Sequence, residues 1–266
     1  GGLQIVDPEK LKKNVQLLWK QKMRKDKLGQ ELHAMIKKYQ PDCLINSRLG
    51  NGAYDYVSLG DNEIPKKLPD KMPETKDGDM NGLGGFKYSP YGLYETAGTM
   101  NSSWGFKYYD QNWIDAATIR ERREKLNAMG INYLLNVGPD ARGNFPPESL
   151  DRLRAIGAWM KFNSKSIYGC GKAGIEKPDY GRVTRNGNRL YFHIYENTLG
   201  PLSLMGLKKE QIRSIRWLAT GAEIPISTSW VHSDYPEIVF ADLGSDPVLP
   251  DPVDTVIEVT LKDTMK

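Results

Sequence analysis

The stretch INYLLNV at residues 131–137 decides the fold, and Gly138 and Pro139 end it at once. Its apolar run is nearly continuous, which is typical of a strand in a parallel sheet that is covered on its outer face. Residues 114–129 come before it and carry a helical apolar pattern that ends at Gly130. A helix followed by a buried strand indicates an α/β fold in which helices cover the sheet.

Neighbouring segments repeat this pattern. Short apolar strands are expected at residues 43–46 and 93–96, and Pro146–Pro147 opens a second helix with one apolar face. Residues 8–39 carry a broken helical apolar face, which Gly29 is expected to divide into two helices. The first part of the chain therefore alternates between helices and strands.

Polar side chains follow three of the expected strands where each strand ends. They are Arg48, Glu95 and Asn136. In a (β/α) barrel, the carboxyl ends of the strands carry the active site. Residues 1–170 are therefore predicted to form a partial (β/α)8-like barrel with a functional site at this end.

The pattern changes after Cys170. Arg185–Asn188 is a hairpin turn signal, and the residues after it alternate between the two faces of a strand. Further strands are expected at residues 202–207, 212–218, 238–240 and 255–261. Short alternating strands predict an antiparallel β-sandwich over residues 171–266, with the domain boundary between residues 165 and 175.

The composition is that of a soluble globular protein. Of its 266 residues, 39% are hydrophobic and 26% are charged, and the net charge is +4. The positive excess lies between Lys10 and Lys38, where a solvated helix face explains it better than a nucleic-acid groove. No apolar run approaches the ~20 residues of a membrane span. Neither nucleic acid nor a membrane is therefore an expected partner.

The cysteines and histidines point to no metal or other cofactor. Cys43 and Cys170 are expected to be buried free thiols, with a single disulfide as the alternative. His33, His193 and His232 lie near no other candidate in the sequence, so neither a metal site nor a Ser-His-Asp triad is expected. The compartment stays open: periplasmic, secreted or lysosomal if the parent has a signal peptide, and otherwise cytoplasmic.

The run Tyr94–Phe106 has the composition of a sugar site. It combines a carboxylate, hydroxyl and amide side chains, and aromatic rings. Carboxylates and amides bind sugar hydroxyls, and aromatic rings cover the C–H faces. Trp104 either stacks on a sugar or is an ordinary core residue. Arg48 either binds a ligand through its fork of donors or forms a surface ion pair.

Glycoside hydrolysis usually takes a pair of carboxylates. Asp55, Asp61, Glu63 and Glu95 lie near strand ends or in the loops that follow. Asp61 suits a general acid on a mobile loop, although an Asp after Gly is also a common turn residue. Glu95 suits either a ligand contact or a structural hydrogen-bond network.

Four segments together resemble glycoside hydrolase family 29, the α-L-fucosidases. They are YETAGTMNSSWG at residues 94–105, NYLLNVGP at 132–139, residues 156–169, and QPDCLINSRLGNG at 40–52. The resemblance implies retaining hydrolysis of terminal α-L-fucose through a covalent fucosyl-enzyme. It also implies a fucosylated oligosaccharide or glycoconjugate as the substrate.

The resemblance also assigns roles to single residues. Asp61 matches the acid/base in the loop after the strand that bears the Arg, with Glu95 and Glu63 as the next candidates. Arg48 is similar to the family's fucose-contacting Arg, and Trp104 to the aromatic that faces the fucose methyl group. Glu95 is assigned to substrate contact or to the architecture of the site.

One family feature is missing from the sequence. The nucleophile is an Asp in a segment that reads roughly W-F-D, which does not occur in these 266 residues. We therefore expect it upstream of Gly1, because Asp7 is better explained as a helix N-cap. The alternatives are a non-catalytic sugar-binding or assembly module, and another retaining hydrolase on a related barrel. A partial barrel exposes sheet edges, so self-association or pairing with the missing N-terminal segment is also expected.

Overall fold

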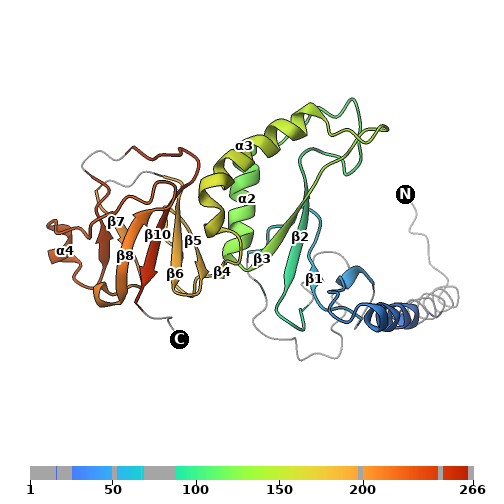
Figure 1. Cartoon of the computed structure of the whole chain (residues 1–266), viewed down its shortest axis with the longest axis horizontal. Helices are drawn as coiled ribbons and strands as arrows, with labels where there is room; N and C mark the ends of the chain where they lie inside the picture. The colour runs from blue at the N-terminus through green and yellow to red at the C-terminus, as the bar shows by residue number, and fades with distance from the viewer. Residues whose placement is uncertain are drawn as a thin grey trace, which may run out of the picture. The chain divides into compact units, whose positions relative to one another are not determined.

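The computed structural model describes residues 16, 26–49, 53–66, 68, 88–196, 200–244 and 248–262. The chain forms two compact units, of which the first holds residues 1–60 and 69–95 and the second residues 61–68 and 96–266. Figure 1 follows the helices and strands along the chain. The chain is a mixed α/β protein with parallel and antiparallel sheets. No helix among the described residues is both long and apolar enough to cross a bilayer.

The first unit contains a helix and a short pair of parallel strands. Residues 26–39 are helical without a break, so Gly29 does not divide the helix as expected. Of residues 8–25, only Gln16 is described. Strand β1 (Val57–Ser58) pairs in parallel with the start of β2 (Tyr94–Thr99).

The strand expected at residues 43–46 is reduced to a single parallel bridge between Asn46 and Tyr56. The reason is local, because the chain turns directly after Asn46 into the 3-10 helix η1 (Ser47–Leu49). Hydrogen bonding supports this corner: the N–H of Ser47 donates to the carbonyl of Tyr56 at 3.0 Å. The polar residues of the following loop are thus tied to the bridge.

Asp55 is a structural residue. Its buried Oδ2 accepts the N–H of Ile45 at 2.8 Å and lies 2.9 Å from Nζ of Lys37. Burial opposes the charge, but the Lys37 and Ile45 donors outweigh it and hold the pKa of Asp55 below its usual range. Asp55 is therefore not the accessible loop carboxylate that its sequence position suggests.

The α/β part of the second unit follows from the end of β2. It comprises α2 (Ala116–Ala128), β3 (Ile131–Asn136), α3 (Pro147–Asn163) and the 3-10 helix η2 (Ser164–Ser166). The expected helices and strand are confirmed, and Asp115 caps α2 by accepting the N–H of Thr118 at 2.8 Å. The apolar residues of β3 are not all buried in the described structure, because Leu134 is 55% exposed.

From Gly171 onward the chain forms two antiparallel sheets. One has the strand order β4-β5-β6-β10-β8 (Figure 1), and the other pairs β7 with β9. The strands are β4 Gly171–Lys172, β5 Gly181–Asn186, β6 Arg189–Ile194, β7 Leu202–Leu204, β8 Ile212–Trp217, β9 Val239–Ala241 and β10 Thr255–Leu261. The short helices are η3 Lys209–Gln211 and α4 Val231–Asp234.

The expected hairpin and the later strands are confirmed. Gly187 has a φ of 59° at the β5–β6 turn, a backbone conformation that Gly adopts without strain. Both antiparallel sheets contribute to one core, which includes Phe192 of β6, Leu202 of β7 and Ile257 of β10. The alternation of apolar residues along these strands therefore serves a shared interior.

A buried polar network joins α2 and α3 to the five-stranded sheet. Nε1 of Trp159 donates to the carbonyl of Asp254 at 2.8 Å. Arg120 binds Asp251 through two hydrogen bonds, of 3.1 and 2.7 Å. Nδ1 of His193 lies 3.0 Å from Oδ2 of Asp254. These contacts fix the register of the helices on the sheet.

Glu124 completes the network with a fully buried side chain. One ligating atom each from Glu124, His193 and Asp254 lie within 4.8 Å of one another, and Nη2 of Arg123 lies 3.0 Å from Oε1 of Glu124. Burial, reinforced by the Asp254 carboxylate, raises the pKa of Glu124 to about 8. Burial also raises the pKa of Asp254 to about 7 and lowers that of His193 to about 4. The carboxyl pair therefore holds a proton at neutral pH beside a neutral imidazole.

We expect the free energy of unfolding to fall as the pH rises from about 6 to about 9. The folded state binds the Glu124 proton more tightly than the unfolded chain does. That stabilisation is complete below the ordinary carboxyl pKa and is lost as the pH passes about 8. The slope reaches at most about 1.4 kcal/mol per pH unit for each proton. The contribution of His193 to the free energy of unfolding depends on pH in the opposite direction. It is lost only as the pH falls below about 6.5.

Urea unfolding at several pH values tests this expectation. Glu124→Gln should flatten the profile between about pH 6 and 9, because Gln never ionises. Glu121→Gln is the matched control from a partly exposed position on α2, and it should keep the wild-type profile. A Glu124→Gln profile parallel to that of the wild type would contradict the proton-sharing account.

Candidate functional site

Asn46 organises the candidate residues of the first unit. Its Oδ1 accepts the backbone N–H of Arg48 at 2.8 Å, and its Nδ2 donates to Oε1 of Glu95 at 3.4 Å. Nε of Arg48 donates to Oγ of Ser58 at 3.3 Å. Arg48 and Glu95 are expected from the sequence, whereas Asn46 is not. The available signal was its position just before Arg48, at the end of an apolar segment.

Arg48 and Glu95 differ in exposure. Arg48 is exposed, and Glu95 is half-buried. Glu95 thus takes part in a hydrogen-bond network, which is one of the two roles expected from the sequence. Its carboxylate can still accept further hydrogen bonds. The Asn46 amide thus bonds to the backbone of Arg48 and to the carboxylate of Glu95, while the guanidinium bonds to Ser58. A guanidinium and a carboxylate suit the recognition of hydroxyl groups.

In the second unit, Asp61 and Glu63 flank a residue with left-handed backbone. Asn62 has a φ of 59°, which Asn tolerates better than most residues. Its N–H donates to the carbonyl of Ala97 at 2.7 Å, and its Oδ1 accepts the N–H of Thr99 at 2.9 Å. The turn is thus fixed to β2 near its carboxyl end. Asp61 is exposed on this turn, and Glu63 is half-buried.

Trp104 lies on a loop held against the end of β3. Nδ2 of Asn136 donates to the carbonyl of Trp104 at 2.8 Å. A Cβ on Gly138 would lie 2.9 Å from the backbone C of Gly105 and 3.0 Å from N of Phe106, so the close approach requires Gly. Trp104 is 41% exposed, which excludes an ordinary core position.

The same loop is tied internally. Oγ of Ser103 donates to Oδ2 of Asp110 at 2.8 Å, and both side chains are buried. Oδ1 of Asp110 accepts the N–H of Asn112 at 3.2 Å. Around this tie the loop exposes the aromatic residues Phe106, Tyr108 and Tyr109. The loop therefore combines a fixed backbone with exposed aromatic rings.

The expected site residues fall into two sets. Arg48 and Glu95 share Asn46 in the first unit. The second unit carries the other three, Asp61, Glu63 and Trp104, on segments fixed to β2 and β3. Asn62 is missed from the sequence because an Asn in a Gly-Asp-Asn segment reads as an ordinary turn residue.

One cluster among the described residues has the residue types of a metal site, Glu124, His193 and Asp254. Oγ1 of Thr184 lies 3.2 Å from Nε2 of His193, which adds a hydroxyl–imidazole–carboxylate order. All four side chains are buried, so a substrate does not reach the hydroxyl. Arg123 adds a positive charge that opposes cation binding. We interpret the cluster as structural, and no local pattern predicts it because His193 and Asp254 are 61 residues apart.

The two cysteines offer no metal or disulfide site. Cys43 and Cys170 are both free thiols. The expectation of free thiols is confirmed, but their expected full burial is wrong, because both residues are only half-buried. Burial raises the pKa of the Cys170 thiol to about 11, so it is protonated at neutral pH.

Comparisons with known proteins agree on one family. Residues 12–165 match the family described as Alpha-L-fucosidase. The chain is 32% identical over 160 residues to an alpha-L-fucosidase of Dictyostelium discoideum. This match covers 50% of this chain and 34% of that protein. Alpha-L-fucosidase isoenzyme 1 from Paenibacillus thiaminolyticus matches in structure with a TM-score of 0.75 at 37% identity, covering 88% of this chain and 54% of that one.

A more distant structure shares the fold. It is a GH29 alpha-L-fucosidase from Bacteroides thetaiotaomicron, solved as a trapped covalent intermediate with 2-fluoro-fucosyl fluoride. The TM-score is 0.66 at 23% identity, covering 87% of this chain and 52% of that one. The chain spans about a third of the length of the Dictyostelium relative and about half of each solved chain.

Gly138→Ala is expected to destabilise the protein by about 1–3 kcal/mol, because the new Cβ would press on the backbone of residues 104–106. Gly157→Ala is the matched control, since a Cβ there meets no atom within 4 Å inside α3. It should be neutral or stabilising by up to about 1 kcal/mol. Urea unfolding measures both variants, and equal effects would contradict the close docking of the loop.

Proposed function

The chain belongs to the alpha-L-fucosidase family of glycoside hydrolases, and from this premise we propose that it supplies the acid/base group and substrate contacts for hydrolysis of terminal α-L-fucose. The observation that carries the proposal is the exposed position of Asp61 on a turn fixed to β2. The substrate is a fucosylated oligosaccharide or glycoconjugate. The reaction proceeds with retention of configuration.

In this proposal residues 1–170 are part of a (β/α)8 barrel and residues 171–266 form a β-sandwich. The parallel pairing of β1 with β2 and the order α2, β3, α3 support the barrel. Two antiparallel sheets with one shared core support the sandwich. The start of β4 at Gly171 supports the boundary.

A retaining acid/base group first gives a proton to the leaving oxygen and later takes one from water. Exposure of Asp61 gives substrate and water access to its carboxyl group, and the fixed turn limits the torsions to be ordered on binding. The proton passes to the glycosidic oxygen as the C–O bond breaks. The carboxylate then takes a proton from the water that attacks the fucosyl-enzyme. Glu95 and Glu63 are the next candidates for this role.

Three other residues serve binding. The guanidinium of Arg48 donates to a fucose hydroxyl, and the carboxylate of Glu95 accepts from one. The ring of Trp104, exposed on its docked loop, covers the apolar face that carries the methyl group. Asn46 acts through Arg48 and Glu95 and is a positioning residue.

A non-catalytic sugar-binding or assembly module is the second candidate. Exposed apolar side chains favour it, because Leu134 on β3 is 55% exposed and Phe162 on α3 is 56% exposed. Such side chains are normally covered by another segment or another chain. Hydrolysis of an aryl fucoside by the 266-residue chain alone would rule this candidate out. Calorimetric binding of fucose without hydrolysis, lost in Arg48→Ala, would favour it.

Asp61→Asn in the complete enzyme is expected to lower kcat/KM for natural fucosides by about 10²–10⁴-fold, because the leaving oxygen no longer receives a proton. For an aryl fucoside with a good leaving group, the rate of the first chemical step, formation of the fucosyl-enzyme, should fall much less. Added azide should restore turnover, because an anionic nucleophile needs no general base.

The controls come from the two competing carboxylates. Glu63→Gln removes a charge from the same loop and should keep most of the turnover. Glu95→Gln should act mainly on KM, as expected of a substrate contact. Wild-type turnover of natural fucosides by Asp61→Asn would refute the assignment and transfer the role to Glu95 or Glu63.

A further inference from the structure

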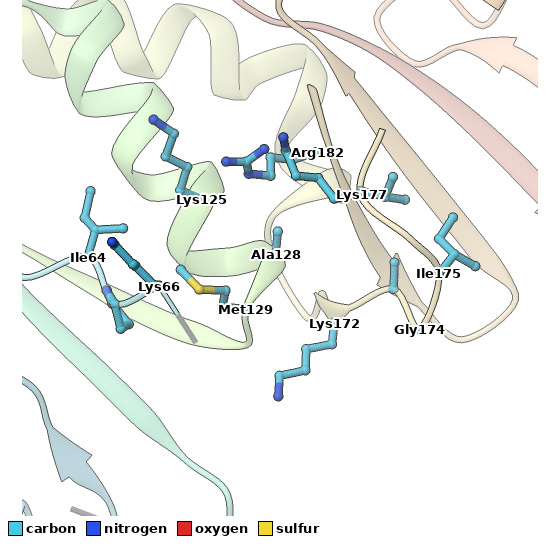
Figure 2. A pocket seen from close by; sticks show the side chains of 13 residues that line it. Ile64, Lys66, Lys125, Ala128, Met129, Lys172, Gly174, Ile175, Lys177 and Arg182 are labelled. Carbon is cyan, nitrogen blue, oxygen red and sulfur yellow. The ribbon is translucent and has the colours of Figure 1, made fainter. Parts of the chain in front are cut away.

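A pocket in the second unit is formed by the carboxyl end of α2, strands β4 and β5, and the loop at Ile64–Lys66 (Figure 2). Its volume is about 550 Å³. Sites for small ligands span roughly 300–1,000 Å³. The pocket shares no lining residue with the expected fucose site.

The pocket combines an apolar surface with a concentration of positive charge. Its apolar side chains include Ile64, Met129, Ile175 and Val183. Among the residues that the structure describes, five basic side chains line it and no acidic one does: Lys66, Lys125, Lys172, Lys177 and Arg182. These five charges exceed the net charge of +4 carried by the whole chain. A concave surface lined by one sign of charge focuses the potential and attracts counter-ions.

Four of the five basic side chains stand on two sides of the pocket. Figure 2 shows Lys66 and Lys125 on one side and Lys177 and Arg182 on the other. Nζ of Lys125 pairs with Oε1 of Glu121 at 2.5 Å, outside the lining. Within the described part of the chain, no carboxylate forms an ion pair with the remaining four basic residues. Among the described residues, most of the pocket's charge therefore has no ion-pair partner.

We propose that this pocket binds an oligoanion that carries at least two sulfate or phosphate groups on a carbon skeleton. Two groups are required because the cations lie on two sides, and a single inorganic ion would leave most of the volume empty. The Arg182 fork suits two oxygens of one tetrahedral group, and the lysines act as point charges. The apolar lining contacts the C–H surface of the skeleton. A sulfated glycan and a phosphorylated small molecule share this chemistry.

Titration calorimetry of the 266-residue chain at low ionic strength tests the proposal with three probes. A heparin-derived tetrasaccharide presents sulfates, inositol hexakisphosphate presents phosphates, and maltotetraose is the neutral control. At least one anionic probe should bind, with an affinity that falls as salt is added, and maltotetraose should not. Lys177→Gln/Arg182→Gln should weaken binding about tenfold or more.

The matched control is Lys209→Gln/Arg213→Gln, which removes the same charge from exposed positions that do not line the pocket. It should change the affinity by less than about twofold. Lys66 lies in a surface loop on the opposite side of the pocket, and Lys66→Gln should weaken binding about threefold or more. This variant keeps the proposal testable if the double variant does not fold. Failure of both anionic probes to bind, or equal weakening in the control pair, would overturn the proposal. Binding of one anionic probe supports it and identifies the source of the anion.

Discussion

Side-chain amides bonded to the backbone hold the segments of the candidate site in place. Asn62 and Asn136 bond to backbone groups of other segments, at Thr99 and Trp104, and Asn46 bonds to the backbone N–H of Arg48, two residues further along the chain. Backbone groups that have no partner in a strand ladder need another hydrogen-bond partner, which these side chains supply. A side-chain amide offers both a donor and an acceptor, so Asn can bond to the N–H groups of Arg48 and Thr99 and to the carbonyl of Trp104. Fixed backbone with exposed side chains is the arrangement that ligand recognition requires.

The helices are joined to the antiparallel sheet by a different device. Glu124, His193 and Asp254 are fully buried, and buried charges lose their solvation. Sharing a proton reduces that cost, and the Arg123 guanidinium lies 4.7 Å above the Trp159 ring while pairing with Glu124. Apolar residues of similar size can be as stabilising as such a network. We infer that its benefit is orientation, since each hydrogen bond specifies which helix residue meets which strand.

Elements set by local pattern were predictable from the sequence. Helix α2, strand β3 and the β5–β6 hairpin appear where periodicity and turn residues predict them. The sequence did not predict that residues 43–46 form only a bridge, because the 3-10 helix at Ser47–Leu49 ends the strand. It also did not predict the structural role of Asp55, because that role depends on the distant Lys37. For the site, strand ends and family motifs indicated the ligand-facing candidates. The residues that position them, Asn46 and Asn62, act through partners tens of residues away, which no local pattern reveals.

Strand order also governs how the five-stranded sheet assembles during synthesis. β10 lies between β6 and β8, so the last strand of the described residues occupies an interior position in the sheet. The β5–β6 hairpin joins neighbours in the chain, whereas the β6–β10 pairing brings Ile194 to Thr255. Local contacts form early and distant ones late. Until residue 261 leaves the ribosome, β6 and β8 each present an open edge to other nascent chains, and these edges are where a chaperone would have to act.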